Sequence, residues 1–255
     1  MILSVVIPCY NEEANITSTL HELMAEMKVM PGLEGYQIIV VDDHSADNTF
    51  GVIKAMNNAA VSCIRLKERR GSHIAIRAGL REARGSAVLF LPADGQEDPG
   101  ILAAMVKKWQ NGARVVWGLN KSGSHKRWHI RKSAELFYML LKWSGATRDA
   151  TVDVSRAAFF LLDRSVVDMV NKCSAPKAPL HGLVISSGPE QAGVEYQRRP
   201  RMSGKSKWSL FDLIGLAKDW IIEFSDMPLI AFLRKARRVL ESKQRRPLFT
   251  IEQRT

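Results

Sequence analysis

The stretch Val88-Leu89-Phe90-Leu91-Pro92-Ala93-Asp94-Gly95-Gln96-Glu97-Asp98-Pro99 passes from four apolar residues to a proline and then to acids. The apolar run predicts a buried strand, and the acids predict a loop where that strand ends. Asp94 and Gln96 are two positions apart in this loop and can turn hard oxygen ligands toward one point, which suits Mg²⁺ or Mn²⁺ holding a diphosphate. An ordinary turn explains the same residues, because Asp, Gly and Pro are common turn formers.

The first hundred residues alternate apolar runs with helical patterns. Strands are predicted over Leu3–Pro8, Tyr36–Val41, Val61–Leu66 and Ala87–Leu91. Helices are predicted between them, and Asp47 or Asn48 can cap the second helix. This alternation predicts an α/β fold with a mostly parallel, doubly wound sheet flanked by helices. In such a sheet, ligands bind beyond the carboxyl ends of the strands.

The second half of the chain is less regular. Further strands are predicted over Arg114–Gly118, Ala157–Leu162 and Val194–Pro200. A helix is predicted over Ser133–Trp143, and an apolar stripe at helical spacing extends from Leu210 to Phe224. We therefore expect amphipathic helices toward the C-terminus. We also expect a main domain over residues 1–229, including an interface helix, and a basic tail over residues 230–255.

The charge of the chain restricts its partners. The 255 residues carry a formal net charge of +11, which indicates a polyanionic partner such as nucleic acid, an acidic membrane surface or a phosphorylated substrate. The 3 cysteines have no CxxC spacing, which argues against a disulfide framework and a zinc site. No apolar run reaches the roughly 18 residues of a membrane-spanning helix. The first residues predict a strand rather than a signal peptide.

Several motifs carry a family resemblance. Val6-Ile7-Pro8-Cys9-Tyr10-Asn11-Glu12-Glu13, Ile38-Ile39-Val40-Val41-Asp42-Asp43-His44-Ser45-Ala46-Asp47-Asn48-Thr49 and Ala93-Asp94-Gly95-Gln96 resemble the signatures of glycosyltransferase family 2, which has the GT-A fold. Arg201-Met202-Ser203-Gly204-Lys205-Ser206-Lys207-Trp208, followed by Phe224-Ser225-Asp226-Met227-Pro228-Leu229, resembles the branch of dolichol-phosphate mannosyltransferases and bacterial polyprenyl-phosphate glycosyltransferases. The resemblance extends to about residue 230. Each motif alone is weak, but four in the right order are specific.

The resemblance implies a role for each matching residue. Binding of the nucleotide sugar is implied for Pro8, Tyr10, Glu12, Val41, Asp43, Ala93, Asp94, Arg201 and Lys207. Metal binding is implied for Asp94 and Gln96, and catalysis for Asp94 with the basic pair Arg201 and Lys207, which closes over the diphosphate. Without the resemblance, Tyr10 and Glu12 would be interpreted as residues of a surface turn. Arg201 and Lys207 would be interpreted as residues of a solvated basic loop.

Two positions depart from the family pattern. Pro92 replaces the first acid of the Asp-Ala-Asp motif, so the metal loses one carboxylate, for which Glu97 or Asp98 would have to substitute. Asn120 and Lys121 replace an arginine after the fifth strand, so we expect Lys121, Arg127 and Arg131 to contact the acceptor phosphate. These changes imply a different donor, weaker metal dependence or lost activity.

The resemblance implies an inverting glycosyltransferase that uses Mg²⁺ or Mn²⁺ and a UDP- or GDP-sugar. The expected acceptor is a polyprenyl phosphate, at an anionic membrane surface on the cytoplasmic, inner face of the cell membrane, where the protein would be peripheral. The chain lacks the Glu-Asp pair and the Gln-x-x-Arg-Trp segment of the family's polysaccharide synthases, which favours a phosphate acceptor. Alternatives are a transferase acting on a saccharide or protein hydroxyl and a non-catalytic binder of nucleotide sugars or polyanions. A homo-oligomer is compatible with the sequence, and no nucleic-acid motif is present.

Overall fold

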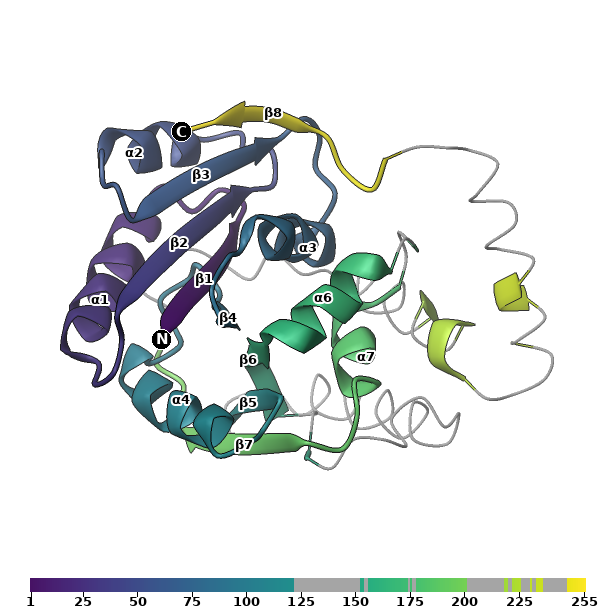
Figure 1. Ribbon diagram of the computed structural model, residues 1–255. Coiled ribbons are helices and arrows are strands. Elements are labelled where there is room, and N and C mark those ends of the chain that lie inside the picture. Colours follow the sequence, from purple (N-terminus) through teal and green to yellow (C-terminus); the bar gives the residue numbers. More distant parts are fainter. Residues whose placement is uncertain are drawn as a thin grey trace.

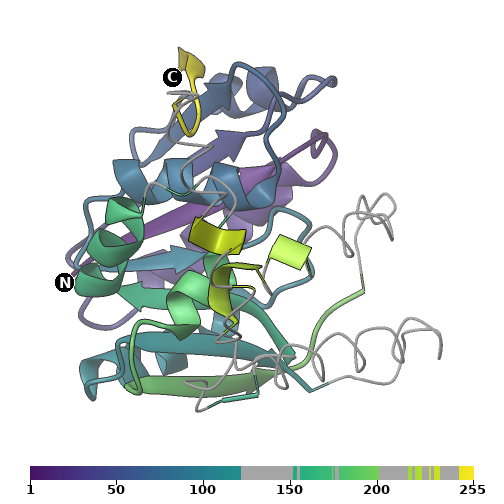
Figure 2. The same ribbon diagram turned by 90° about the vertical axis from the view of Figure 1, so that its right-hand side faces the viewer.

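The computed structural model of the chain is built around one eight-stranded sheet with the order β7-β5-β6-β4-β1-β2-β3-β8 (Figure 1). It describes residues 1–121, 152–153, 156–173, 175, 178–200, 218–219, 222–225, 230, 233–235 and 247–255. The strands are β1 (Ile2–Cys9), β2 (Gly35–Asp42), β3 (Val61–Leu66), β4 (Ala87–Phe90), β5 (Val115–Asn120), β6 (Ala157–Asp163), β7 (Gln191–Tyr196) and β8 (Ile251–Arg254). Figure 2 shows them stacked from the yellow C-terminal segment at the top to green β7 at the bottom. The predicted α/β fold class is confirmed.

The N-terminal half of the sheet is parallel, as predicted. β1 pairs in parallel with β2 and β4, and β2 pairs in parallel with β3. These strands are rich in Val, Ile and Leu and are largely buried, as expected of strands covered by helices on both faces. In the other half, β6 lies antiparallel to β4 and to β5, while β5 pairs in parallel with β7. The sheet is therefore mixed, with a parallel majority.

Helices cover both faces of this sheet. Their bounds are α1 (Ile16–Val29), α2 (Thr49–Ala55), α3 (Ser72–Glu82), the 3₁₀ helix η1 (Pro99–Ile101), α4 (Leu102–Gln110), α6 (Arg164–Lys172) and α7 (Leu180–Ile185). α3, α6 and α7 contact one another in series on one face, and α1, α2, η1 and α4 lie on the other (Figure 1). A Cβ at Gly79 of α3 would lie 2.3 Å from Val6 Cγ1, so only glycine allows α3 to pack this closely on β1.

The strand predicted over Val194–Pro200 was placed too far along the chain. β7 begins at Gln191 and ends at Tyr196, after which the chain leaves the sheet. The reason is electrostatic, because Arg198 and Arg199 form ion pairs with acids of the 94–98 loop instead of continuing the strand. Pro200 has no N–H to donate to a ladder. The predicted helix over Ser133–Trp143 and most of the Leu210–Phe224 stripe lie outside the described residues.

The end of the chain forms a strand that the sequence did not predict. β8 pairs antiparallel with β3 and closes that edge of the sheet (Figure 1). Both terminal nitrogens of Arg254 donate to the Glu82 carboxylate at 2.9 Å, and Thr255 exchanges hydrogen bonds with Cys63. Residues 251–254 are thus part of the sheet, while the proposed division at residue 229 stays a prediction. No helix in the described part of the chain is long and apolar enough to cross a bilayer.

Two largely buried histidines, His73 and His181, lie in an aromatic cluster on the face covered by α3, α6 and α7. The His181 ring is within 6.2 Å of the rings of His73, Trp117 and Phe160, measured between centroids. Burial, with a smaller contribution from the neighbouring His73, lowers the pKa of His181 to about 3. Burial also lowers the pKa of His73 to about 4, although Asp219 opposes this shift.

These pKa values predict a loss of stability in mild acid. Below about pH 6.5 the two histidines bind protons in the unfolded chain but not in the folded chain. Their contribution to the unfolding free energy is therefore fully present above that pH and is lost as the pH falls toward about 4. We expect His181→Phe to remove about 2 kcal/mol of the difference in unfolding free energy between pH 7.5 and pH 5. Urea unfolding at both pH values measures it. His21→Gln, at an exposed position of α1, is the control, and an equal acid sensitivity of parent and His181→Phe would contradict the assignment.

Candidate active site

The carboxyl ends of β1, β2 and β4 bring most of the predicted site residues to one edge of the sheet. Pro8 of β1 and Val41 of β2 are register partners, and Asp43 follows β2 directly. β4 lies on the other side of β1, and the loop that follows it carries Ala93 and Asp94. The two ligand-bearing loops predicted from the sequence therefore flank the end of β1, as expected for a site beyond strand ends.

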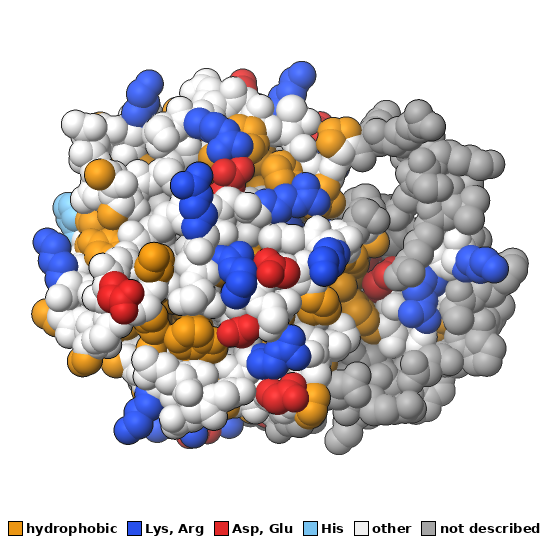
Figure 3. Space-filling view, viewed as in Figure 1, with side chains coloured by type: hydrophobic (Ala, Val, Ile, Leu, Met, Phe, Trp, Pro, Cys, Tyr) orange, Lys and Arg blue, Asp and Glu red, His pale blue; other side chains and the backbone are white. Residues whose placement is uncertain are grey.

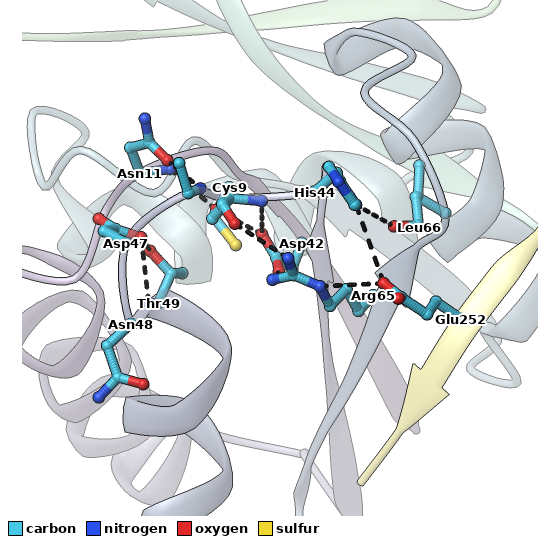
Figure 4. A network of polar contacts seen from close by, with 12 residues as sticks. Cys9, Asn11, Asp42, His44, Asp47, Asn48, Thr49, Arg65, Leu66 and Glu252 are labelled. Atoms are coloured by element: carbon cyan, nitrogen blue, oxygen red, sulfur yellow. Dashed lines mark hydrogen bonds and ion pairs between the residues drawn. The ribbon is translucent and has the colours of Figure 1, made fainter.

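The loop after β1 is interlocked with the loop after β2 (Figure 4). The backbone N–H of Asn11 donates to Ser45 Oγ at 2.9 Å, and Asn11 Oδ1 accepts from the N–H of Ala46 at 2.8 Å. The N–H of Glu12 donates to Thr49 Oγ1 at 2.9 Å, and its carboxylate accepts from Asn15 Nδ2 at 2.7 Å. Tyr10 and Glu12 are consequently held on a fixed backbone rather than on a loose surface turn.

Asp42 is the buried anchor of this pair of loops. Its Oδ1 accepts from the N–H of Ser45 at 3.0 Å, and its Oδ2 accepts from Arg65 Nη1 at 2.6 Å. Arg65 in turn contacts Glu252 of β8 through Nε at 3.2 Å, so the terminal strand supports the same network (Figure 4). Because the Asp42 side chain is fully buried and committed to these donors, its role is structural.

Asp43 holds the loop that follows β3. Its two carboxylate oxygens accept from the backbone N–H groups of Arg70 and Gly71, at 2.7 and 2.8 Å. Burial raises the pKa of Asp43, and these two hydrogen bonds oppose the rise. The loop places the Arg69 guanidinium 4.1 Å from the centre of the Tyr10 ring. The sequence shows a basic loop here, but only the fold brings Arg69 to the predicted nucleoside site.

The loop after β4 presents Asp94 and Gln96. Gly95 has a φ of +67°, a conformation that favours glycine, and the turn lets Asp94 Oδ1 accept from the N–H of Gln96 at 3.3 Å. Thr19 Oγ1 of α1 donates to the Ala93 carbonyl at 3.1 Å. Gln96 Nε2 donates to the Arg199 carbonyl at 3.2 Å, and the side-chain oxygen is the atom that would bind a metal ion.

The donor set fits a divalent ion only in part. Pro92 offers no ligand, and the two acids proposed as substitutes are committed elsewhere, Glu97 to Arg198 at 3.0 Å and Asp98 to Arg199 at 2.8 Å. Among the described residues, no group of three His, Cys, Asp or Glu side chains could hold a metal ion. Asp94 and Gln96 remain. Mg²⁺ is commonly held by one or two protein oxygens plus substrate phosphates, so these two residues suit an ion shared with a diphosphate.

The predicted phosphate contacts are described only in part. Lys121 is exposed, and its N–H donates to the Tyr196 carbonyl at 2.9 Å, at the ends of β5 and β7. The Tyr196 hydroxyl donates to Glu97, so Tyr196 connects the end of β7 with the 94–98 loop. Arg127, Arg131, Arg201 and Lys207 lie outside the described residues, and their roles stay predictions.

Comparisons with known proteins agree with this arrangement. The family model described as Glycosyl transferase family 2 matches residues 4–167. An uncharacterized glycosyltransferase of Bacillus subtilis, YkcC, is 32% identical over 231 residues, which cover 89% of this chain and 69% of the relative. A bactoprenol glucosyl transferase of Shigella phage SfV is 29% identical over 231 residues, covering 90% of this chain and 74% of the relative.

A solved structure confirms the predicted GT-A fold. It is glucosyl-3-phosphoglycerate synthase from Mycobacterium tuberculosis in complex with Mn²⁺, UDP and phosphoglyceric acid. The TM-score is 0.60 at 22% identity, and the match covers 87% of this chain and 76% of that chain. At this identity, the likeness supports the fold and leaves the substrates of the present chain open.

Proposed function

The chain belongs to glycosyltransferase family 2, and from this premise we propose that it transfers a sugar from a nucleotide donor to a polyprenyl phosphate. As a member of the family it is a nucleotide-sugar-dependent glycosyltransferase, which argues against the non-catalytic alternative. The observation that carries the acceptor class is the likeness to bactoprenol glucosyl transferases over 90% of the chain. We place the acceptor, and with it a peripheral location of the protein, at an anionic membrane surface.

The roles of the residues follow from their positions. Pro8, Tyr10, Glu12, Val41 and Asp43 would hold the nucleoside beyond β1 and β2, and Ala93 would contribute to donor binding beside Asp94. Asp94 and Gln96 would hold Mg²⁺ or Mn²⁺, which when bound neutralises the diphosphate leaving group. Arg201 and Lys207 would donate hydrogen bonds to the remaining phosphate oxygens. Lys121, with Arg127 and Arg131, would bind the acceptor phosphate.

The proposed reaction is a single displacement with inversion. An acceptor phosphate oxygen forms the new bond to the anomeric carbon, and the bond from that carbon to the diphosphate breaks as the diphosphate leaves with the electron pair. A phosphate monoester is already anionic near pH 7, so no proton has to be removed from it. Positioning of two anions by cationic side chains is then the main task of the protein.

A donor and acceptor panel tests the proposal. Purified protein with Mn²⁺ would be given UDP-, GDP-, CMP- and dTDP-sugars, each with a polyprenyl phosphate, the matching polyprenol or a free saccharide. We expect one donor to give a glycolipid with the polyprenyl phosphate and at least ~100-fold less product with the polyprenol, because the acceptor phosphate is the nucleophile. Transfer to the saccharide or the polyprenol, and none to the phosphate, would favour a hydroxyl acceptor and overturn the assignment.

A further inference from the structure

Arg198 lies between the predicted metal ligand and a second, deeply buried carboxylate. Its Nη2 is 3.0 Å from Glu97 Oε1 and 3.9 Å from Asp94 Oδ2. The Glu97 side chain is 0% exposed, and the Tyr196 hydroxyl donates to its other oxygen. The Arg198 guanidinium thus balances part of the negative charge of the Asp94 and Glu97 carboxylates, both of which it contacts. We call Asp94, Glu97 and Arg198 the charge triad.

The backbone segments that carry the charge triad are hydrogen-bonded to each other. The N–H of Arg199 donates to the Gln96 carbonyl at 2.9 Å, so the backbone beyond β7 is bound to the loop beyond β4. The Arg198 side chain is about a third exposed, and its buried Nε–H has no acceptor among the described residues. Because part of the Arg198 side chain is exposed, its guanidinium can still be reached by a phosphate oxygen.

The net charge of the triad opposes the binding of a free metal ion. With both acids ionised the triad carries one net negative charge, and the loop offers a divalent ion only Asp94 and Gln96 as ligands. A guanidinium 3.9 Å from Asp94 would repel a cation held by that carboxylate. A nucleoside diphosphate would bring its own oxygens and negative charge, and its phosphates would attract both the ion and Arg198.

We propose that Arg198 is an internal counter-ion that weakens binding of free Mg²⁺ or Mn²⁺ at Asp94, so that the ion binds together with the nucleoside diphosphate. Arg198 is in this sense a positioning residue for the metal and the donor. The inference rests on the proposed metal-dependent transfer, but it concerns a binding equilibrium that needs neither donor sugar nor acceptor.

Four proteins separate the effect of charge from the effect of structure. Burial raises the pKa of Glu97 and Arg198 opposes that rise, so the comparison is made at about pH 8 to keep both acids ionised. The triad then has a net charge of −2 in Arg198→Gln, −1 in the parent and in the Arg198→Gln/Glu97→Gln double variant, and 0 in Glu97→Gln. Affinity for free Mn²⁺, measured from the EPR signal of unbound Mn²⁺, should follow that order. We expect about tenfold tighter binding in Arg198→Gln than in the parent, about tenfold weaker binding in Glu97→Gln, and a return toward the parent value in the double variant.

The controls make the outcome decisive. Arg198→Lys keeps the charge and should bind free Mn²⁺ like the parent. Arg199→Gln removes a neighbouring arginine that pairs with Glu22 and Asp98, and it should leave Mn²⁺ affinity unchanged. Addition of UDP should tighten Mn²⁺ binding more in the parent than in Arg198→Gln.

Several outcomes would overturn the proposal. One is that a folded Arg198→Gln protein binds free Mn²⁺ no more tightly than the parent. If that variant does not fold, the proposal is overturned when the double variant fails to restore the affinity lost in Glu97→Gln. Loss of sugar transfer with the expected Mn²⁺ order would instead count against the proposed function alone.

Discussion

Replacing Asp94 with asparagine is expected to lower sugar transfer by about 100- to 1,000-fold while leaving the fold intact. Of the three acids in the loop after β4, Asp94 is the one least committed to an arginine, because Arg198 is 3.9 Å from Asp94 but 3.0 Å from the fully buried Glu97, and Arg199 is 2.8 Å from Asp98. An asparagine at this position would keep a side-chain oxygen to accept from the N–H of Gln96, so the turn should survive. Steady-state kinetics, calorimetric titration of UDP with and without Mn²⁺, and thermal melting measure the three parts of this prediction.

Asp98→Asn is the matched control for this variant. It removes the same charge from a later position in the same loop, where the carboxylate caps η1 and contacts Arg199 at the surface. We expect a change in transfer of only a few-fold, because exposed ion pairs contribute little. If Asp94→Asn bound the nucleotide as tightly as the parent with and without Mn²⁺, Asp94 would not be the metal ligand.

The sequence predicted the parallel half of the sheet well because its signals are local. The β3 strand has the predicted bounds, and β1, β2 and β4 differ from prediction by a single residue at one or both ends. β8 could not be predicted in this way. Its four residues, Ile-Glu-Gln-Arg, have little apolar character, and the strand exists because it pairs with β3 and because Arg254 reaches Glu82. Pairing between strands that are far apart in the sequence leaves no local pattern of apolar residues from which the strand could be predicted.

The same division holds for the site. Pro8, Val41 and Asp94 occur at strand ends that periodicity identifies, and the family resemblance supplies their expected roles. The charge triad joins Asp94 and Glu97 to an arginine that is far away in the sequence, and the strand predicted over Val194–Pro200 would have placed that arginine in the sheet. Arg69 was visible only as one cation in a basic loop. Its position over Tyr10 depends on Asp43 holding the loop backbone.

The charge of the chain is unevenly distributed, and this bears on membrane attachment. The described residues hold 22 of the 37 Lys and Arg and 21 of the 26 Asp and Glu, so they are close to neutral. On the face shown in Figure 3, basic and acidic side chains are interspersed. The remaining 15 Lys and Arg, with 5 acids, belong to the rest of the sequence, including most of the basic segment from Lys235 to Arg246. We infer that an anionic surface would be recognised by that segment rather than by the body of the domain.

Changing Lys235, Arg237 and Arg238 together to Gln is expected to weaken binding to anionic vesicles about 100-fold, since each cation near such a surface contributes roughly 1 kcal/mol. Arg234 is left unchanged because its guanidinium donates to the carbonyls of Glu223 and Ser225, at 2.7 and 2.8 Å, and so supports the fold. Truncation after Leu229 would be a poorer test, because it also removes β8. The control changes three exposed lysines of the described domain, Lys107, Lys108 and Lys172, to Gln.

Co-sedimentation with anionic and neutral vesicles at low and high salt measures the effect. Binding should require anionic lipid and weaken with salt, because exposed charges are screened. It should fall in the 235–238 variant and persist in the lysine control, since both lose the same net charge and differ only in position. Equal loss in the two variants would indicate a nonspecific effect of total charge. Undiminished binding by the 235–238 variant would rule out these three cations as the anchor and leave Lys243, Arg245 and Arg246, or the apolar stripe from Leu210 to Phe224, to make the contact.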